Sequence, residues 1–136
     1  MVATTVLLVD DDDRLRSIVR TVLEDDGLEI VADLDDGKDA VRLVDQLRPD
    51  VVLLDMMLPS QPGLAVADAI RKIRPDQAIV LFSSLLDPKI ERMAVAHGLT
   101  YLEKCDGIEA LEGAIARALG RRERQLDRAE QPVLVH

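Results

Sequence analysis

Five short apolar runs alternate with five amphipathic stripes along the chain, and this alternation restricts the fold more than any other feature. The runs cover residues 6–9, 28–34, 51–54, 78–82 and 100–103. Most of them are apolar at successive positions, which is typical of strands buried on both faces of a parallel sheet. The stripes repeat at intervals of three and four residues and predict helices around residues 15–23, 40–47, 66–73, 90–97 and 108–119.

Strict alternation of strands and helices predicts an α/β fold with helices on both faces of a parallel sheet. Right-handed crossovers leave few topologies for five such units. We therefore predict a flavodoxin-like (βα)5 fold, a doubly wound five-stranded sheet with strand order 2-1-3-4-5. Ligands bind such sheets outside the carboxyl ends of the strands, above strands 1 and 3 where the strand order switches.

Composition supports one soluble domain with an acidic first half. The chain has 136 residues, of which 48% are hydrophobic and 32% charged, so it can build its own core. Residues 1–55 hold 15 acids against 6 basic residues, and residues 56–136 hold 11 of each. An acidic surface repels phosphate backbones, so we expect no direct nucleic acid binding by this chain.

The chain also lacks the marks of a membrane or secreted protein. No apolar run approaches the roughly 20 residues of a membrane span, and the first residues have no basic segment typical of a signal peptide. The single cysteine, Cys105, favours a reducing, cytoplasmic location. We expect a domain over residues 1–120, followed by a basic helix extension or linker over residues 121–136 that is too short for a DNA-binding domain.

Acidic residues directly follow the first and third predicted strands. Asp10 to Asp13 follow the first strand, and Asp55 follows the third. Adjacent parallel strands lie about 4.8 Å apart, so these carboxylates should converge. Crowded carboxylates raise one another's pKa unless a cation neutralises them, and Mg²⁺ prefers oxygen ligands. For Asp12 and Asp13 we favour helix capping, and for Asp10 and Asp11 metal binding.

With these acids in place, the sequence resembles the receiver domain of two-component response regulators over residues 4–119. Four segments carry the resemblance, in family order. They are the run from Val6 to Asp11, the segment from Pro49 through Asp55 to Pro59 with Gly63 after it, Ser83 at the end of the fourth strand, and Tyr101-Leu102-Glu103-Lys104.

The resemblance implies a role for each of these site residues. Asp55 would accept a phosphoryl group from a sensor histidine kinase or a phosphotransfer protein. Lys104 and the Ser83 hydroxyl would bind the phosphoryl oxygens. Asp11 and Asp55 would bind Mg²⁺ through their side chains, Met57 through its carbonyl and Asp10 through water. Such a protein catalyses only its own phosphorylation and dephosphorylation and is not otherwise an enzyme.

The resemblance also implies a switch. Tyr101 would turn inward as Ser83 moves toward the phosphoryl group, and the surface of the fourth helix, fifth strand and fifth helix would change for a downstream protein, an output domain or a second copy of the chain. The competing interpretation of Tyr101 is a ring that covers part of the core. The sequence does not identify the cognate kinase, the signal, the target or the oligomeric state, nor does it separate a stand-alone receiver from part of a larger regulator.

Two other functions compete. A Mg²⁺-dependent phosphohydrolase of the haloacid dehalogenase type also uses an aspartate at a strand end, but it needs a second aspartate where this chain has Met57. A flavodoxin-like cofactor binder would need a Ser-, Thr- or Gly-rich phosphate loop where this chain has four aspartates. Both alternatives are disfavoured.

Overall fold

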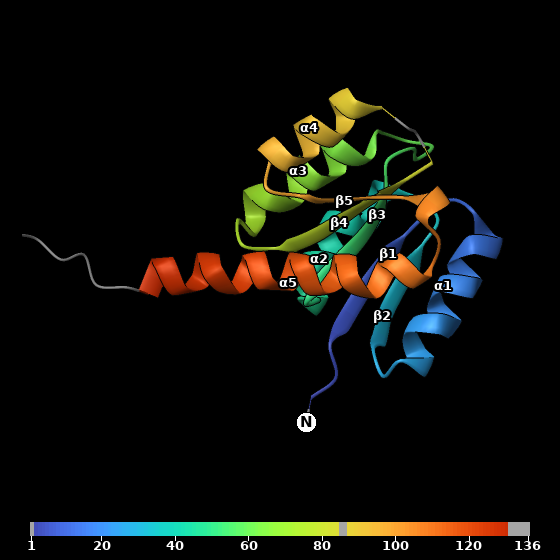
Figure 1. The fold of residues 1–136 in the computed structure, drawn as a ribbon, viewed down its shortest axis with the longest axis horizontal. Coiled ribbons are helices and arrows are strands. Elements are labelled where there is room, and N and C mark those ends of the chain that lie inside the picture. Colours follow the sequence, from blue (N-terminus) through green and yellow to red (C-terminus); the bar gives the residue numbers. More distant parts are fainter. Residues whose placement is uncertain (1, 85–86, 131–136) are drawn as a thin grey trace, which may run out of the picture.

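The computed structural model, which describes residues 2–84 and 87–130, has the predicted parallel sheet (Figure 1). The strand order is β2-β1-β3-β4-β5, and every neighbouring pair is parallel. The strands are β1 (Thr5–Val9), β2 (Glu29–Leu34), β3 (Val51–Asp55), β4 (Ala78–Ser83) and β5 (Thr100–Glu103). The predicted α/β class and strand order are therefore confirmed.

Five α-helices and two short 3-10 helices connect the strands. They are α1 (Asp13–Asp25), η1 (Gly37–Asp39), α2 (Ala40–Leu47), α3 (Gly63–Ile73), α4 (Pro88–Ala96), η2 (Lys104–Asp106) and α5 (Glu109–Glu130). No helix within the described residues is long and apolar enough to cross a membrane.

The central strands are buried on both faces because each face packs against its own helices. Val6 and Leu8 of β1 belong to one core with residues of α1 and α5. Leu7 and Val9, which point the other way, belong to a second core with residues of α2, α3 and α4. All four side chains are at most 2% exposed, which explains why this strand reads as a continuous apolar run.

Helix α5 extends past the end of its apolar stripe, which is one of the two forms predicted for the basic segment that starts at residue 121. The apolar stripe predicted a helix to residue 119, whereas α5 continues through Gly120 to Glu130 and extends beyond the sheet in Figure 1. Arg121 donates from Nη1 to the carbonyl of Leu99 at 2.8 Å, and Arg122 from Nη1 to the carbonyl of Asp50 at 3.4 Å. These bonds attach the start of the basic segment to the amino-terminal edge of the sheet. The domain boundary at residue 120 stays a prediction, and residues 131–136 lie outside the described residues.

Candidate functional site

The strand-end carboxylates meet at one point. The register pairs Val9 of β1 with Leu54 of β3, so the next residues, Asp10 and Asp55, lie side by side. Both are buried, with 2% and 4% of their surfaces exposed, whereas Asp11 is exposed. Carboxylate oxygens of these three residues lie within 4.8 Å of one another. The structure therefore brings together the three acids that the sequence selected.

Lys104 completes this cluster from the carboxyl end of β5. Its Nζ lies 3.0 Å from Oδ2 of Asp10 and 3.4 Å from Oδ2 of Asp55. The two carboxylates raise the pKa of Lys104 although its burial acts in the opposite direction, so the ammonium stays charged. Its Nζ also lies 5.6 Å from the centroid of the Phe82 ring, within the range of a cation–π contact. Sequence analysis had not given Phe82 a role in the site.

Burial raises the pKa of Asp55 to about 6. The neighbouring charge of Asp10 adds to this rise, while the backbone N–H of Met57 and the ammonium of Lys104 oppose it. The Met57 N–H donates to Oδ1 of Asp55 at 3.1 Å. The predicted repulsion between carboxylates is therefore present, but removal of Asp55 from water contributes more.

This raised pKa predicts a pH-dependent stability. The folded chain holds the Asp55 proton up to about pH 6, while the unfolded chain releases it near pH 4, so stability is lost as the pH rises through this window. Without Mg²⁺, Asp55→Asn should stabilise the fold, and its advantage over the wild type should grow by about 1 kcal/mol between pH 5 and pH 7.5. Urea unfolding in EDTA measures this difference. Asp45→Asn, on the exposed side of α2, is the control, and an Asp55→Asn advantage that does not change with pH would contradict the prediction.

The charge and donor types of the cluster fit Mg²⁺. Three carboxylates and one ammonium leave two formal negative charges, which a divalent cation neutralises. All the donor atoms are carboxylate oxygens, the ligand type that Mg²⁺ prefers. Asp10 and Asp55 are too buried for water alone to compensate their charges.

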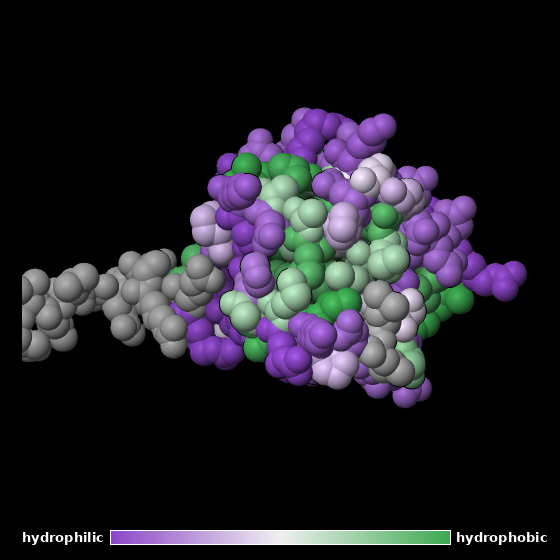
Figure 2. Space-filling model, turned by 90° about the horizontal axis from the view of Figure 1, so that it is seen from above, coloured by the Kyte–Doolittle hydropathy of each residue, from purple (hydrophilic) through white to green (hydrophobic). Residues whose placement is uncertain are grey.

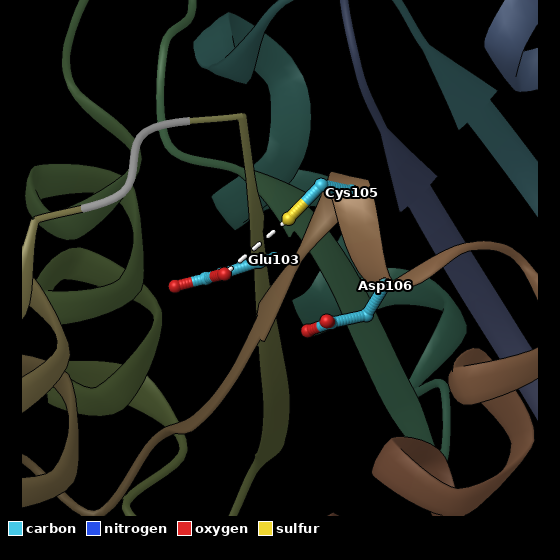
Figure 3. Close-up of side chains that lie close together, drawn as sticks. All are labelled: Glu103, Cys105 and Asp106. Carbon is cyan, nitrogen blue, oxygen red and sulfur yellow. Dashed lines mark hydrogen bonds between the residues drawn. The ribbon is translucent and has the colours of Figure 1, made fainter.

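A second group with potential metal ligands lies at the end of β5, in Figure 3. Glu103, Cys105 and Asp106 have ligand atoms within 4.8 Å of one another. The exposed thiol of Cys105 donates to Oε2 of Glu103 at 3.4 Å, and this bond raises the pKa of the thiol, which keeps it protonated. A protonated thiol is a poor metal ligand, so we assign the cation to the strand-end acids.

The loop between β3 and α3 is held tightly against Asp55. The N–H of Gly63 donates to the carbonyl of Met56 at 2.7 Å, and Met57 and Pro62 form an antiparallel bridge. A Cβ on Gly63 would lie 2.2 Å from the carbonyl oxygen of Asp55. Glycine is required here by this close approach of two backbone segments.

The two residues of the proposed switch contact each other. Ser83 is completely buried at the end of β4, and Tyr101 is half-buried against the core shared with α2, α3 and α4. Burial raises the pKa of Tyr101, and a side-chain hydrogen bond with Ser83 partly offsets this rise. The ring thus covers part of the core, as the competing interpretation held, and is also bonded to Ser83.

Helix α1 starts next to the carboxylate cluster, and Asp12 and Arg16 hold its first turn in place. Asp12 is its N-cap, and its Oδ1 accepts from the N–H groups of Arg14 and Leu15 at 3.1 Å each, which confirms the predicted capping. Arg16 donates from Nη1 to the carbonyl of Asp10 at 2.6 Å, and its Nη2 pairs with Asp13. Sequence analysis missed Arg16, because one arginine in an amphipathic helix gives no signal of its own.

The family model of the response regulator receiver domain matches residues 6–116, which include all the clustered residues. The chain belongs to the receiver domain family of response regulators. It is therefore a receiver domain of two-component signalling, and the phosphohydrolase and flavodoxin alternatives are set aside.

Known relatives agree with this assignment. The receiver domain is 35% identical over 112 residues to the response regulator GacA of Pseudomonas aeruginosa, covering 81% of this chain and 52% of GacA. It is 32% identical over 116 residues to the transcriptional regulatory protein PdtaR of Mycobacterium tuberculosis, covering 85% of this chain and 57% of PdtaR. The chain thus spans about half the length of these relatives.

Solved structures show the same fold. A two-component response regulator of the LuxR family from Aurantimonas sp. SI85-9A1 is similar with a TM-score of 0.82 and 27% identity, over 88% of this chain and 86% of that one. A DNA-binding response regulator of the LuxR family from Staphylococcus aureus has a TM-score of 0.78 and 30% identity, over 85% of this chain and 98% of that one.

Proposed function

We propose that this receiver domain takes a phosphoryl group on Asp55 from a sensor histidine kinase or a phosphotransfer protein. The observation that carries the proposal is the position of Asp55, buried at the end of β3 between two other carboxylates and the Lys104 ammonium. Phosphoryl transfer depends on positioning and charge neutralisation, and this cluster supplies both.

The proposed reaction is a displacement at phosphorus. A carboxylate oxygen of Asp55 forms the new bond to phosphorus, and the donor leaves with the electron pair of the bond that breaks. Lys104 and the Ser83 hydroxyl bind oxygens of the transferred group. Asp11, Asp55 and the carbonyl of Met57 would hold Mg²⁺ directly and Asp10 through water, and the ion would neutralise charge on the phosphoryl oxygens. The domain would catalyse only this step and the later hydrolysis, in which water takes the phosphoryl group and leaves inorganic phosphate and a free Asp55 carboxylate.

The consequence of phosphorylation would be a change at the surface of α4, β5 and α5. Ser83 and Tyr101 already contact each other, so a Ser83 hydroxyl drawn toward the phosphoryl group would release the ring. Figure 2 shows apolar side chains gathered on the face seen from above. On α4, Met93 and Val95 are 49% and 54% exposed, which suits contact with a downstream protein, an output domain or a second copy of the chain. The proposal places the domain in the cytoplasm, as its single cysteine suggests.

A direct test uses the purified chain. Incubation with acetyl phosphate or phosphoramidate and Mg²⁺ should add the mass of one phosphoryl group, and EDTA should prevent the addition. Intact-mass spectrometry measures both. Absence of the added mass at saturating donor and Mg²⁺ would refute the proposed function.

The phosphoryl group should be lost slowly. Hydrolysis needs a water held in line with the bond to phosphorus, and the side chain two residues after Asp55 is the apolar, 58% exposed Met57. Its thioether neither orients a water nor accepts its proton. The sequence places a second apolar residue, Leu85, two positions after Ser83, and Leu85 lies outside the described residues. Met57→Asn should speed the decay about tenfold, because its amide can hydrogen-bond a water and hold it in line with the bond to phosphorus.

Decay is followed by mass spectrometry after the donor is removed. The affinity for Mg²⁺ should change little, since the ligand at Met57 is its backbone carbonyl. A wild-type decay as fast as that of Met57→Asn would show that this side chain does not control the water.

A further inference from the structure

The loop of residues 57–62, which carries the Met57 carbonyl, is bonded to a second loop that the proposed function does not use. Asp36 lies two residues after the end of β2 and is the N-cap of η1. Its Oδ1 accepts from the N–H of Gly37 at 2.8 Å and from the N–H of Ser60 at 3.2 Å. Its Oδ2 accepts from the hydroxyl of Ser60. One carboxylate therefore binds both polar groups that Ser60 offers as donors.

Asp36 is itself held in place by close packing. Gly37 is buried, and a Cβ there would lie 2.5 Å from Cγ2 of Val66 in α3 and 3.4 Å from Cδ1 of Leu58. The backbone after Asp36 thus rests directly on α3 and on the 57–62 loop. Because the backbone next to Asp36 is held by this packing, its carboxylate can restrain the position of Ser60.

The other restraints on the loop come from its own two ends. Met57 donates to Oδ1 of Asp55, Met57 pairs with Pro62, and Gly63 donates to Met56. Within the part of the chain that the structure describes, the side-chain hydrogen bonds of Asp36 alone reach the middle of this loop from another part of the fold. Asp36 and Asp11 also line one cleft, with Asp13, Asp35 and Pro59, so this contact lies beside the proposed metal site.

We propose that Asp36 and Ser60 are positioning residues for the phosphoacceptor site: their hydrogen bonds fix the 57–62 loop, whose Met57 carbonyl would be a ligand of Mg²⁺. The inference rests on the proposed function. It adds that residues outside the carboxylate cluster help to set the affinity for Mg²⁺. The bond from Ser60 lowers the pKa of Asp36, so its carboxylate stays an acceptor at neutral pH.

Four variants separate positioning from charge. Ser60→Ala removes the hydroxyl, Asp36→Asn weakens the acceptor and removes a charge, and Asp35→Asn removes the same charge from the same cleft without touching Ser60. We expect Ser60→Ala and Asp36→Asn to weaken Mg²⁺ binding about threefold to tenfold. Loss of a residue that hydrogen-bonds a metal ligand costs roughly 10- to 100-fold in metal affinity, and we expect an effect at or below the lower end of that range. Asp35→Asn should weaken it less than Asp36→Asn. Ser60→Thr, which keeps a hydroxyl, should restore the wild-type affinity.

For each variant, isothermal titration calorimetry measures the dissociation constant of Mg²⁺, and mass spectrometry measures the rate of phosphoryl uptake. Urea unfolding gives the midpoint of denaturation of the same variants. A purely structural role would lower the urea midpoint and leave the affinity of the folded protein for Mg²⁺ unchanged, and that result overturns the inference. Equal weakening by Asp35→Asn and Asp36→Asn also overturns it, because charge would then suffice. If the wild type neither binds Mg²⁺ nor takes up phosphoryl groups, the proposed function fails and the inference with it. A functional wild type with unchanged variants overturns the inference alone.

Discussion

Asp55→Asn should abolish phosphorylation of the chain while leaving it folded. An amide lacks the charged nucleophilic oxygen, so no acyl phosphate forms at the end of β3. The variant should gain no phosphoryl mass after incubation with acetyl phosphate and Mg²⁺, under conditions in which the wild type gains one group. Peptide mapping of the wild type should place that group on Asp55.

Two further variants make this result specific. Asp45→Asn, exposed on α2, should gain the phosphoryl group like the wild type. Asp11→Ala should take up the group only at higher Mg²⁺ concentration, because it loses one of the few charged ligands. Retention of the full phosphoryl mass by Asp55→Asn would show that another residue is the acceptor.

Gly63→Ala should be among the most destabilising single-methyl changes in the domain. The added Cβ would lie 2.2 Å from the carbonyl oxygen of Asp55 and 2.8 Å from Cα of Met56, so backbone must move. Overpacking of this kind costs about 2 to 3 kcal/mol. Urea unfolding should show this loss, and Mg²⁺ binding should weaken because the phosphoacceptor loop moves with α3.

The chain offers a matched control at Gly113. A Cβ there would meet only Nη1 of Arg117, at 3.4 Å, and the residue is exposed within α5. Gly113→Ala should therefore stabilise the domain by up to about 1 kcal/mol, the gain from replacing glycine inside a helix. If the two substitutions change stability equally, the close approach at Gly63 is not the cause of its effect.

Much of the fold followed from local patterns. Buried parallel strands must be apolar on both faces, so their runs and the helix-spaced stripes between them predicted the five strands, the five α-helices and the strand order, but not the 3-10 helices η1 and η2. The boundaries of the helices were less predictable. Helix α3 begins at Gly63, although its apolar stripe begins at Val66. Helix α5 continues to Glu130, and no proline interrupts the sequence between residues 109 and 131. Side chains that cap or extend a helix need not be apolar, so periodicity does not reveal them.

The sequence by itself determined which acids and which lysine end the strands, because residues that follow parallel strands must gather at one edge of the sheet. Tertiary structure alone decided the pairings across that edge. Lys104 lies between Asp10 and Asp55 and over Phe82, and Asp36 reaches Ser60, 24 residues further along the chain. These contacts depend on how two loops approach each other, which is set by the packing of Gly37 and Gly63 against backbone and side chains. Hydrophobic periodicity does not predict such a close approach of two loops. In the sequence, a glycine that allows a tight turn cannot be told from a glycine that allows another segment to pack against the backbone.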